Sequence, residues 1–567
     1  MPDKGEYDVC VVGSGAAGFA AALTASLRGK TVLMVEKESF FGGTTAYSAG
    51  AMWIPNSDRA AARQVPDSPA RALQYLRSLI GPHLDHDRAA RFLDTAPTML
   101  RLFETHGFVQ MKLVSNWADY HSAEPGGTDG GRSLVSDLFD GRELGEWFER
   151  LRPPLTTTMG LGGFMLDIHD MSHVYRAGTS PRSLAYVGAL ALRYFTDRMR
   201  HSRGTRLAGG NALIGRLAAH SLRRGISLWL NASAVELIED GGRICGVVVE
   251  RDGARLKIRV RGGVILAAGG YPRDHKRLRQ THRHIAAGKG HVMLPPEGTS
   301  GDGIRMAEAR GARFKNATHH PAAWTPVSLV PQSNGEAIPF PHFIDRGKPG
   351  CISVDRRGNR FVSESTSYHC FGAAMLEACQ EDDEIAVWNI SDHRNIRRFG
   401  LGALGPTPSP METFIRSGYI KRGRTLDELA NLCGIDAEGL KRTLVRFNRF
   451  AETGVDLDFR RGEDAYQVFN GLRGNEPNPC MAAIAHPPFY AVKMGIGALG
   501  TFSGLATNAD AEVLDKAGQP IPGLYAAGND SANFMDGTYP GSGISIASAM
   551  VFGYIAGQHA SARIACE

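Results

Sequence analysis

The sequence predicts an α/β protein built on one nucleotide-binding domain that long insertions interrupt. Three observations predict this fold. A glycine-rich turn joins a strand to a helix near the N-terminus, further apolar strands end in glycine near the middle and the C-terminus, and capped amphipathic helices occupy the region between them. Hydrophobic residues make up 43% and charged residues 22% of the 567 positions, which is typical of globular proteins.

Composition and charge exclude several classes of protein. The chain has 64 Lys and Arg against 58 Asp and Glu, a net charge of +6, and the basic residues are scattered, so no nucleic-acid partner is expected. The eight cysteines form no C-x-x-C pair, which argues against a disulfide scaffold and a metal site. No run of 18 or more apolar residues predicts a transmembrane segment. Because the N-terminus is acidic, unlike an export signal, we expect a cytoplasmic location.

The N-terminal element carries the fingerprint of a dinucleotide site. A buried strand at residues 7–12 leads into a G-x-G-x-x-G turn, a helix runs to about residue 28, and a second strand at residues 31–35 ends at Glu36. Gly13 permits the tight turn, Gly15 lets the backbone approach a pyrophosphate, and Gly18 lets the helix pack on the strand. Glu36 is placed to accept hydrogen bonds from ribose hydroxyls, and its charge disfavours a 2′-phosphate.

The other glycine-terminated strands are distributed over the whole chain. They are predicted at residues 226–235, at residues 263–271 and at residues 522–530. Each of these strands alone would be common in any α/β sheet. Together with the N-terminal fingerprint they predict a single nucleotide-binding domain whose segments are far apart in sequence.

This arrangement, together with residues 38–50 and their Gly42-Gly43-Thr44-Thr45 loop, resembles the flavoprotein subunits of the succinate dehydrogenase/fumarate reductase superfamily. The resemblance implies a discontinuous Rossmann-type FAD-binding domain and FAD held without a covalent bond. The residues that it places against FAD are Gly13, Ser14, Gly15, Ala16, Ala17, Gly18, Glu36, Lys37, Gly43, Thr44, Thr45, Gly50, Val235, Ala268, Gly269, Gly528, Asn529, Asp530, Gly543 and Ile544.

The C-terminal loop, residues 537–554, indicates which branch of this superfamily the chain resembles. Dicarboxylate reductases of the superfamily need arginines to clamp carboxylates, and residues 537–554 contain none. The Tyr539-Pro-Gly-Ser-Gly543 turn resembles the 3-ketosteroid 1-dehydrogenases. The resemblance also covers residues 119–121, 125–127, 298–303, 350–354, 358–368, 489–493 and 499–501.

The residues of these motifs suit the removal of two hydrogens beside a ketone. That reaction needs a base for the α-proton, a hydride acceptor and hydrogen-bond donors for the carbonyl oxygen. The Tyr539 hydroxyl and the Gly543 N–H at a helix N-terminus suit the donor role, and one such donor is worth ~3–4 kcal/mol in a transition state. The resemblance implies that Tyr368 takes the α-proton, with Tyr120 stabilising its phenolate, and that the hydride passes to flavin N5. Trp117 and Phe343 are candidates for a hydrophobic pocket for a cyclic ketone.

Two departures from the family affect the pocket wall. Residues 496–498 read Ile-Gly-Ala where Pro-Gly-Asp is expected, and residues 544–548 read Ile-Ser-Ile-Ala-Ser where Ala-Thr-Ile-Gly-Pro is expected. A smaller ketone of the cyclohexanone type would use the same catalytic groups as a steroid. Two other functions stay open, a reductase of an activated C=C bond and a flavin electron-transfer subunit. The sequence does not specify the electron acceptor.

We predict five segments. The FAD-binding domain comprises residues 1–112, 141–296 and 486–567, and an inserted α+β substrate domain comprises residues 297–485 with the excursion 113–140. Capped amphipathic helices are expected at residues 425–430 and 437–450 of the substrate domain. Residues 142–200, which are rich in Arg, Leu and aromatic residues, are expected to form a helical excursion near the site or a subunit contact.

Overall fold

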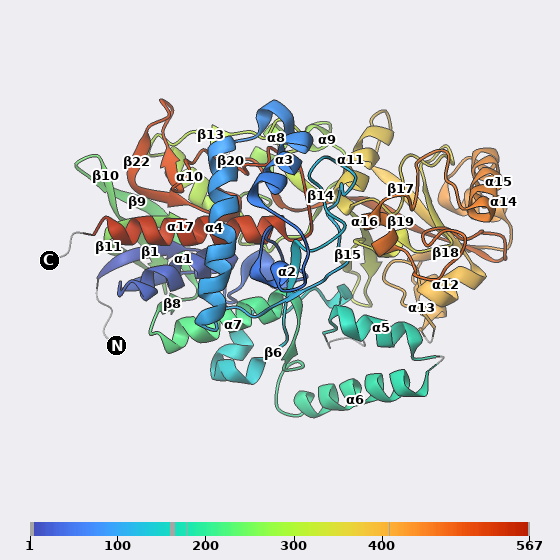
Figure 1. Cartoon of the computed structure of the whole chain (residues 1–567), viewed down its shortest axis with the longest axis horizontal. Helices are drawn as coiled ribbons and strands as arrows, with labels where there is room; N and C mark the ends of the chain where they lie inside the picture. The colour runs from blue at the N-terminus through green and yellow to red at the C-terminus, as the bar shows by residue number, and fades with distance from the viewer. Residues whose placement is uncertain (1–4, 159–164, 179, 408, 565–567) are drawn as a thin grey trace.

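Two large β-sheets organise the molecule. The computed structural model describes residues 5–158, 165–178, 180–407 and 409–564. In this part of the chain, one sheet of eight strands carries the elements from the two ends of the sequence, and one sheet of seven strands carries elements from its second half. Figure 1 shows the first sheet on the left and the second on the right.

The first sheet is largely parallel and has β1 at its centre. β1 pairs in parallel with β2 on one side and with β11 on the other, so the chain changes direction along the sheet at this strand. In such sheets ligands bind outside the carboxyl ends of the strands at the switch point. The strands of this sheet are β1 (Glu6–Val12), β2 (Val32–Val35), β8 (Ser227–Trp229), β9 (Ala232–Asp240), β10 (Arg243–Arg251), β11 (Ala254–Leu266), β21 (Glu512–Leu514) and β22 (Pro520–Ala526).

Two alanine- and glycine-rich helices pack closely beside this sheet. Helix α1 (Ala16–Leu27) lies against helix α17 (Ile544–Ala562), as Figure 1 shows. A Cβ atom added to Gly553 would lie 2.3 Å from the Ala17 carbonyl oxygen, and one on Gly557 would lie 2.5 Å from that of Ala21. The helices can therefore approach this closely only with glycine at both positions. Their contact brings the start of the last helix next to the N-terminal glycine turn.

The local predictions for the first sheet hold, with one correction. The strands at residues 7–12, 31–35, 263–271 and 522–530 correspond to β1, β2, the end of β11 and β22. The single strand predicted at residues 226–235 is instead two strands, β8 and β9. Asn231 lies between them with φ of 51°, a left-handed conformation that ends the extended run.

The second sheet is assembled around strand β19 (Phe489–Thr501). This strand pairs with β12, β14, β17 and β18. The predicted segmentation placed residues 489–501 with the FAD-binding domain, whereas their strand partners are those of the second sheet. The other strands are β12 (Val292–Met293), β14 (Ala322–Pro331), β15 (Ala337–Pro341), β16 (Cys351–Val354), β17 (Ala386–Asp392) and β18 (Ile420–Gly423).

Helices cover the second sheet as the sequence predicts. α14 (Leu426–Cys433) begins after Thr425 and α15 (Ala437–Thr453) after Asp436, and both capping side chains accept backbone N–H bonds.

The further helices of the described chain are α2 (Asp58–Ala61), α3 (Pro69–Ile80), α4 (His86–Thr105), α7 (Gly209–Arg223), α8 (His275–Thr281), α9 (Arg283–Ala286), α10 (Asp302–Glu308), α11 (Tyr368–Ala378), α12 (His393–Phe399), α13 (Met411–Arg416) and α16 (Ala465–Asn470).

Short strands and 3₁₀ turns complete the molecule. Strands β3 (Ala51–Trp53), β4 (Met111–Leu113) and β5 (Ser133–Ser136) form a small antiparallel sheet near the start of α17. The remaining short elements are β6 (Phe139–Asp140), β7 (Arg206–Leu207), β13 (Phe314–Lys315), β20 (Gly504–Leu505), η1 (Gly43–Tyr47), η2 (Gly81–His83), η4 (Thr156–Thr158), η5 (Asp345–Gly347) and η6 (Gly528–Asp530).

The predicted excursion at residues 142–200 is mainly helical where it is described. It contains η3 (Gly141–Arg150), α5 (Ile168–Arg176) and α6 (Pro181–Arg198), and the last two lie along one side of the molecule in Figure 1. Residues 159–164 and 179 of this segment lie outside the described residues. Four large apolar side chains of the excursion are more than half exposed: Leu184, Leu192, Phe195 and Met199.

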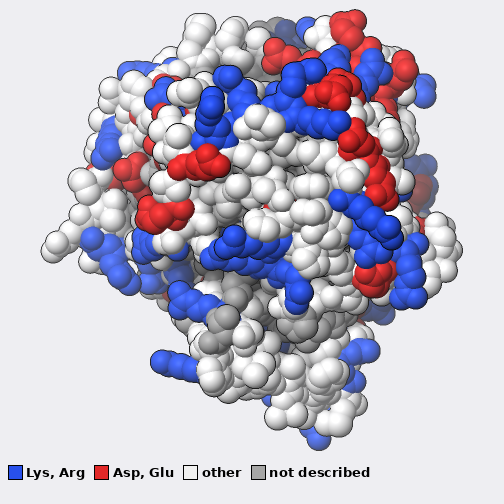
Figure 2. Space-filling view, turned by 90° about the vertical axis from the view of Figure 1, so that its right-hand side faces the viewer, with Lys and Arg blue, Asp and Glu red and all other residues white. Residues whose placement is uncertain are grey.

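The surface agrees with the scattered charge of the sequence. Figure 2 shows basic and acidic side chains intermixed over the upper part of the face it presents, rather than an extended basic stripe. Each helix among the described residues is too short or too polar for a membrane span.

Candidate active site

The glycine turn after β1 fits a bound dinucleotide. Gly13 has φ of 106°, and a Cβ there would lie 2.2 Å from the Ala267 carbonyl oxygen, while one on Gly18 would lie 2.1 Å from that of Gly13. Packing within the protein therefore accounts for both glycines. Gly15 is different, because the nearest atom to its Cβ position is the Thr45 Oγ1 at 3.8 Å. The space beside Gly15 suits the close approach of a pyrophosphate to the helix N-terminus.

Glu36 lies at the carboxyl end of β2, beside this turn. Its carboxylate accepts hydrogen bonds from the Ser14 hydroxyl at 2.6 Å, the Ser14 N–H at 3.2 Å and the Glu38 N–H at 3.1 Å. Burial raises the pKa of Glu36, and the Ser14 hydrogen bonds oppose that rise. The neighbouring Lys37 is already engaged, since its ammonium donates to the Ser300 hydroxyl at 2.7 Å and pairs with Asp302.

The Gly-Gly-Thr-Thr loop lies against the glycine turn. The Thr45 hydroxyl accepts from the Ala16 N–H at 3.3 Å, and the Cβ position of Gly43 is 3.6 Å from the Gly15 Cα. Thr44 belongs to the same 3₁₀ turn, η1. Gly50 serves packing instead, because a Cβ there would lie 2.4 Å from the Gly209 backbone.

Asp530 joins two strand ends on the other side of β1. Its carboxylate accepts from the Ala268 N–H at 2.6 Å and from the Gly270 N–H at 2.9 Å. Burial raises its pKa to about 6. The connection places Gly269, with φ of 92°, beside the η6 turn that contains Gly528 and Asn529. Val235 lies at a register shift between β9 and β10, where its backbone is outside the regular ladder.

The C-terminal loop ends at the N-terminus of α17. Gly543 is the residue before the helix, with φ of 85°, and a Cβ there would lie 2.3 Å from the Ala51 backbone. No hydrogen bond within the described chain uses the Gly543 N–H. The next residue, Ile544, is the first residue of the helix. Tyr539 lies just before this turn, and its hydroxyl is 3.3 Å from the Ser545 Oγ. The N–H and the hydroxyl are thus available at the positive end of a 19-residue helix.

The structure brings the three predicted tyrosines together from three distant segments. The rings of Tyr120 and Tyr539 stack with their centroids 5.5 Å apart. The Tyr368 ring lies edge-on to both, with centroids 5.8 Å from Tyr120 and 5.6 Å from Tyr539. We call Tyr120, Tyr368, Tyr466 and Tyr539 the tyrosine cluster, because Tyr466 lies 4.6 Å from Tyr120.

All members of the tyrosine cluster favour the neutral phenol. Burial raises the pKa of Tyr120 and Tyr368 well above 10, raises that of Tyr539, and raises that of Tyr466 to about 12. Hydrogen-bonding interactions with Tyr120 and Tyr539 raise the pKa of Tyr368 further. This differs from the expectation that Tyr120 stabilises a Tyr368 phenolate. The physical reason is that a phenol that donates to its neighbours loses those bonds when it ionises.

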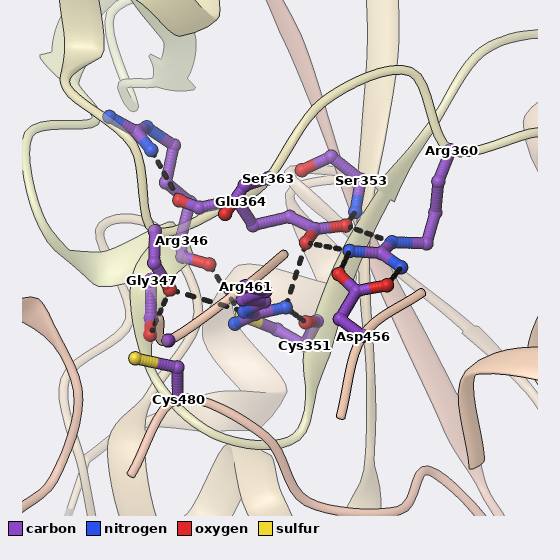
Figure 3. A network of polar contacts seen from close by, with 12 residues as sticks. Arg346, Gly347, Cys351, Ser353, Arg360, Ser363, Glu364, Asp456, Arg461 and Cys480 are labelled. Carbon is purple, nitrogen blue, oxygen red and sulfur yellow. Dashed lines mark hydrogen bonds and ion pairs between the residues drawn. The ribbon is translucent and has the colours of Figure 1, made fainter. Parts of the chain in front are cut away.

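Helix α11 positions Tyr368. Ser367 caps the helix, and Tyr368 is its first residue. The guanidinium of Arg346 donates to the carbonyl oxygens of Glu364 and Thr366, the latter at 2.8 Å, and so holds the approach to the helix. Figure 3 shows Arg346 above the Glu364 backbone in this arrangement.

A buried ionic network anchors the same segment. Figure 3 shows the Glu364 carboxylate between two guanidinium groups. Arg360 donates to it twice at 2.8 Å and Arg461 once at 2.9 Å, while Arg360 also pairs with Asp456 at 2.8 Å. Burial alone would raise the pKa of Glu364, but the two arginines hold it below the ordinary value. The network ties the loop before Tyr368 to a second loop almost one hundred residues later in the chain.

A second buried network positions Tyr120. The carboxylate of the preceding residue, Asp119, accepts from the Trp53 indole N–H and the Arg132 guanidinium, each at 2.7 Å. Arg132 also pairs with Asp67 at 2.7 Å. The Tyr120 N–H itself donates to the Pro540 carbonyl oxygen at 3.0 Å. The backbone of Tyr120 is therefore joined directly to the loop that carries Tyr539.

Apolar side chains surround the cluster. Phe343 lies edge-on to Tyr368 at 5.2 Å, and Trp117 stacks on Phe469 at 5.4 Å and packs against the same core. The sequence did not single out Phe502, at 5.9 Å from Tyr539, or Tyr466. Tyr466 lies in a short helix without a motif of its own, so no local signal in the sequence distinguishes it.

The fold and the dinucleotide site define a flavin-type nucleotide-binding protein. A glycine turn, an acidic strand end and a helix N-terminus meet at the switch point of the first sheet. The family model described as FAD binding domain matches residues 8–546. The chain therefore belongs to this family of FAD-binding proteins.

Relatives with full-length matches are dehydrogenases. The chain is 37% identical to the 4-oxocyclohex-2-ene-1-carboxylate 5-dehydrogenase of Sinomonas cyclohexanicum, over 97% of this chain and 93% of the relative. It is 36% identical to the 3-oxosteroid 1-dehydrogenase of Mycobacterium tuberculosis, over 98% of each. It is 35% identical in sequence to the crystal structure of 3-ketosteroid Δ1-dehydrogenase from Sterolibacterium denitrificans in complex with 1,4-androstadiene-3,17-dione, with a TM-score of 0.90 over 99% of this chain and 100% of that one. The protein is an FAD-dependent oxidoreductase acting on CH–CH groups.

Proposed function

We propose that the protein desaturates a cyclic ketone between its α- and β-carbons. The observation that carries the proposal is the meeting of Tyr368, Tyr539 and the Gly543 N–H at the start of α17. These groups supply, at one place, a proton acceptor and two donors for a carbonyl oxygen. The helix that follows the glycine turn of the dinucleotide site, α1, packs against the same helix, α17.

Each residue of the site has a separate role in the proposed reaction. The Tyr539 hydroxyl and the Gly543 N–H hold the ketone oxygen, and the positive end of α17 stabilises the negative charge that develops there. Tyr368 removes the α-proton, and Tyr120 and Tyr466 fix the orientation of its ring and hydroxyl. The dinucleotide site would hold FAD, whose flavin would supply the acceptor for a hydride from the β-carbon. This hydride transfer needs no covalent bond between FAD and the protein. We therefore expect acid denaturation to release FAD.

The surroundings support a neutral, apolar ketone. Phe343 and Phe502 face the tyrosines, and Trp117 packs against the same core. Residues 537–554 carry no arginine to clamp a dicarboxylate. The substrate class is therefore a hydrophobic cyclic ketone, either a 3-ketosteroid or a smaller ring of the cyclohexanone type.

A substrate panel tests the proposal. The purified holoprotein is incubated with an artificial electron acceptor and with 4-androstene-3,17-dione, cyclohexanone or 4-oxocyclohexanecarboxylate, and products are identified by mass. The proposal requires loss of two hydrogens from at least one ketone. Tyr539→Phe is the matched control, since it should retain FAD and lose turnover. Reduction of an enone by the reduced protein, without oxidation of any saturated ketone, would assign the reverse activity instead.

A further inference from the structure

A cysteine and a histidine form a pair beside the tyrosine cluster. The Sγ of Cys370 lies 3.6 Å from the Nε2 of His121. His121 directly follows Tyr120, and Cys370 is the third residue of α11, whose first residue is Tyr368. The Cys370 N–H donates to the Ser367 hydroxyl at 3.2 Å, which fixes the cysteine in the first turn. The thiol is therefore held at a helix N-terminus against an imidazole.

The two side chains favour the ionised pair. Burial alone would raise the pKa of Cys370, but the hydrogen bond and charge of His121 outweigh it and hold the pKa below the ordinary value. Burial alone would lower the pKa of His121, yet the contact with Cys370 raises it. Thiolate, rather than thiol, is the nucleophilic form of cysteine. The other ionisable groups that act on the pair are Arg346, Glu124, Asp464, Tyr75, Tyr466 and His369.

The other cysteines of the described chain provide a contrast. Cys370 and Cys245 are partly exposed, and the remaining five are buried. Burial raises the pKa of all five buried thiols, which makes them poor nucleophiles. They are Cys10, Cys351, Cys379, Cys433 and Cys480.

We propose that Cys370 is a covalent modification site for small, soft carbon electrophiles, and that modification there disables the tyrosine cluster. With an α,β-unsaturated carbonyl compound, sulfur forms a bond to the β-carbon and His121 delivers the proton that the α-carbon takes up. With iodoacetamide, sulfur forms a bond to the methylene carbon, the carbon–iodine bond breaks and iodide leaves. The proton held by His121 is then lost to solvent.

The contacts of His121 explain why an adduct would reach the cluster. A group attached to Sγ lies beside the His121 imidazole, whose Nε2 is 3.6 Å from the sulfur. The His121 N–H donates to the Tyr75 hydroxyl at 3.2 Å, and that hydroxyl donates to the Pro540 carbonyl oxygen at 2.6 Å. The Tyr120 N–H donates to the same oxygen. Displacement of residues 120–121 therefore shifts the loop that carries Pro540 and the residue before it, Tyr539.

Labelling of the holoprotein with iodoacetamide at pH 7 tests the site. Peptide masses give the adduct at each cysteine over time, and ketone turnover is measured in parallel. Cys370 should be labelled at least about tenfold faster than Cys245, with loss of turnover at the same rate. In His121→Gln, labelling of Cys370 should slow about tenfold and its pH midpoint should rise toward the ordinary thiol value of about 8.5.

Two further variants separate the possible outcomes. Cys370→Ser should keep its own starting turnover after treatment, and Cys245→Ser should lose turnover as fast as the wild type. Faster labelling at Cys245, or labelling of Cys370 that is unaffected by His121→Gln, would overturn the proposal. The link to the tyrosine cluster rests on the proposed dehydrogenation, whereas the labelling does not. If no ketone is turned over, the peptide masses still decide whether Cys370 is the reactive thiol.

Discussion

The pH dependence of turnover follows from the burial of Tyr368. If Tyr368 accepts the α-proton, only the phenolate form is active, and burial raises the pKa of this group well above 10. A group with a pKa of about 10 is ionised in only about one molecule per thousand at pH 7. Because the phenolate fraction grows with pH until the pKa is passed, kcat should rise about tenfold per pH unit between pH 7 and pH 9, or about 100-fold overall.

The assay is steady-state turnover of a saturating ketone from pH 6 to pH 10, with an artificial acceptor and with flavin absorbance recorded at each pH to show that FAD stays bound. Tyr368→Phe should lose at least about 10²-fold in kcat at pH 9 and should lack the rise. Tyr490→Phe is a matched control, since Tyr490 is also buried with a raised pKa but contacts His393, away from the cluster. It should keep the wild-type profile. A kcat that is flat or falls between pH 7 and pH 9 would refute Tyr368 as the base.

Four other substitutions have defined outcomes. Tyr539→Phe removes one of two carbonyl donors, so kcat should fall ~10²–10³-fold with a smaller change in KM, and slow exchange of the ketone α-protons into deuterated solvent, followed by NMR, should fall in parallel. Gly15→Val should fold but lose the flavin absorbance, because its Cβ would meet no protein atom closer than the Thr45 Oγ1 at 3.8 Å, whereas Gly13→Val should also lower the melting temperature, because its Cβ would lie 2.2 Å from a carbonyl oxygen. Glu364→Gln should lower the free energy of unfolding by about 3–5 kcal/mol at pH 7, since it breaks a buried ion pair. Because the pKa of Glu364 is lowered in the folded protein, this difference in the free energy of unfolding is present above the unfolded-state pKa of about 4.3 and is lost as pH falls below it. Denaturant titrations of both proteins at several pH values would measure it.

The N-terminal nucleotide site could be predicted almost completely from the sequence. Gly13, Gly15, Gly18 and Glu36 lie within one strand–turn–helix–strand unit, where spacing along the chain fixes spacing in three dimensions. The helix caps Thr425 and Asp436 were predictable for the same reason. Prediction was less accurate where one residue departs from its neighbours, as at Asn231, whose left-handed backbone divides an otherwise continuous apolar run.

The tyrosine cluster required the tertiary structure. The resemblance to a known family pointed to Tyr120, Tyr368 and Tyr539, but nothing local in the sequence indicated Tyr466 or the pair of His121 and Cys370. These side chains come from separate segments, and their distances depend on the packing of the two sheets and on buried ion pairs between remote loops.

The sequence by itself therefore determined the nucleotide-binding unit, the family and the kind of cofactor, because those depend on short patterns of glycine, acidic and apolar residues. Only the tertiary structure decided the electrostatics of the site. A pKa depends on burial and on the charges within a few ångströms, and neither follows from position in the chain. That is why the structure gives the Tyr368 hydroxyl a raised pKa and makes the Cys370 thiol a partner of an imidazole.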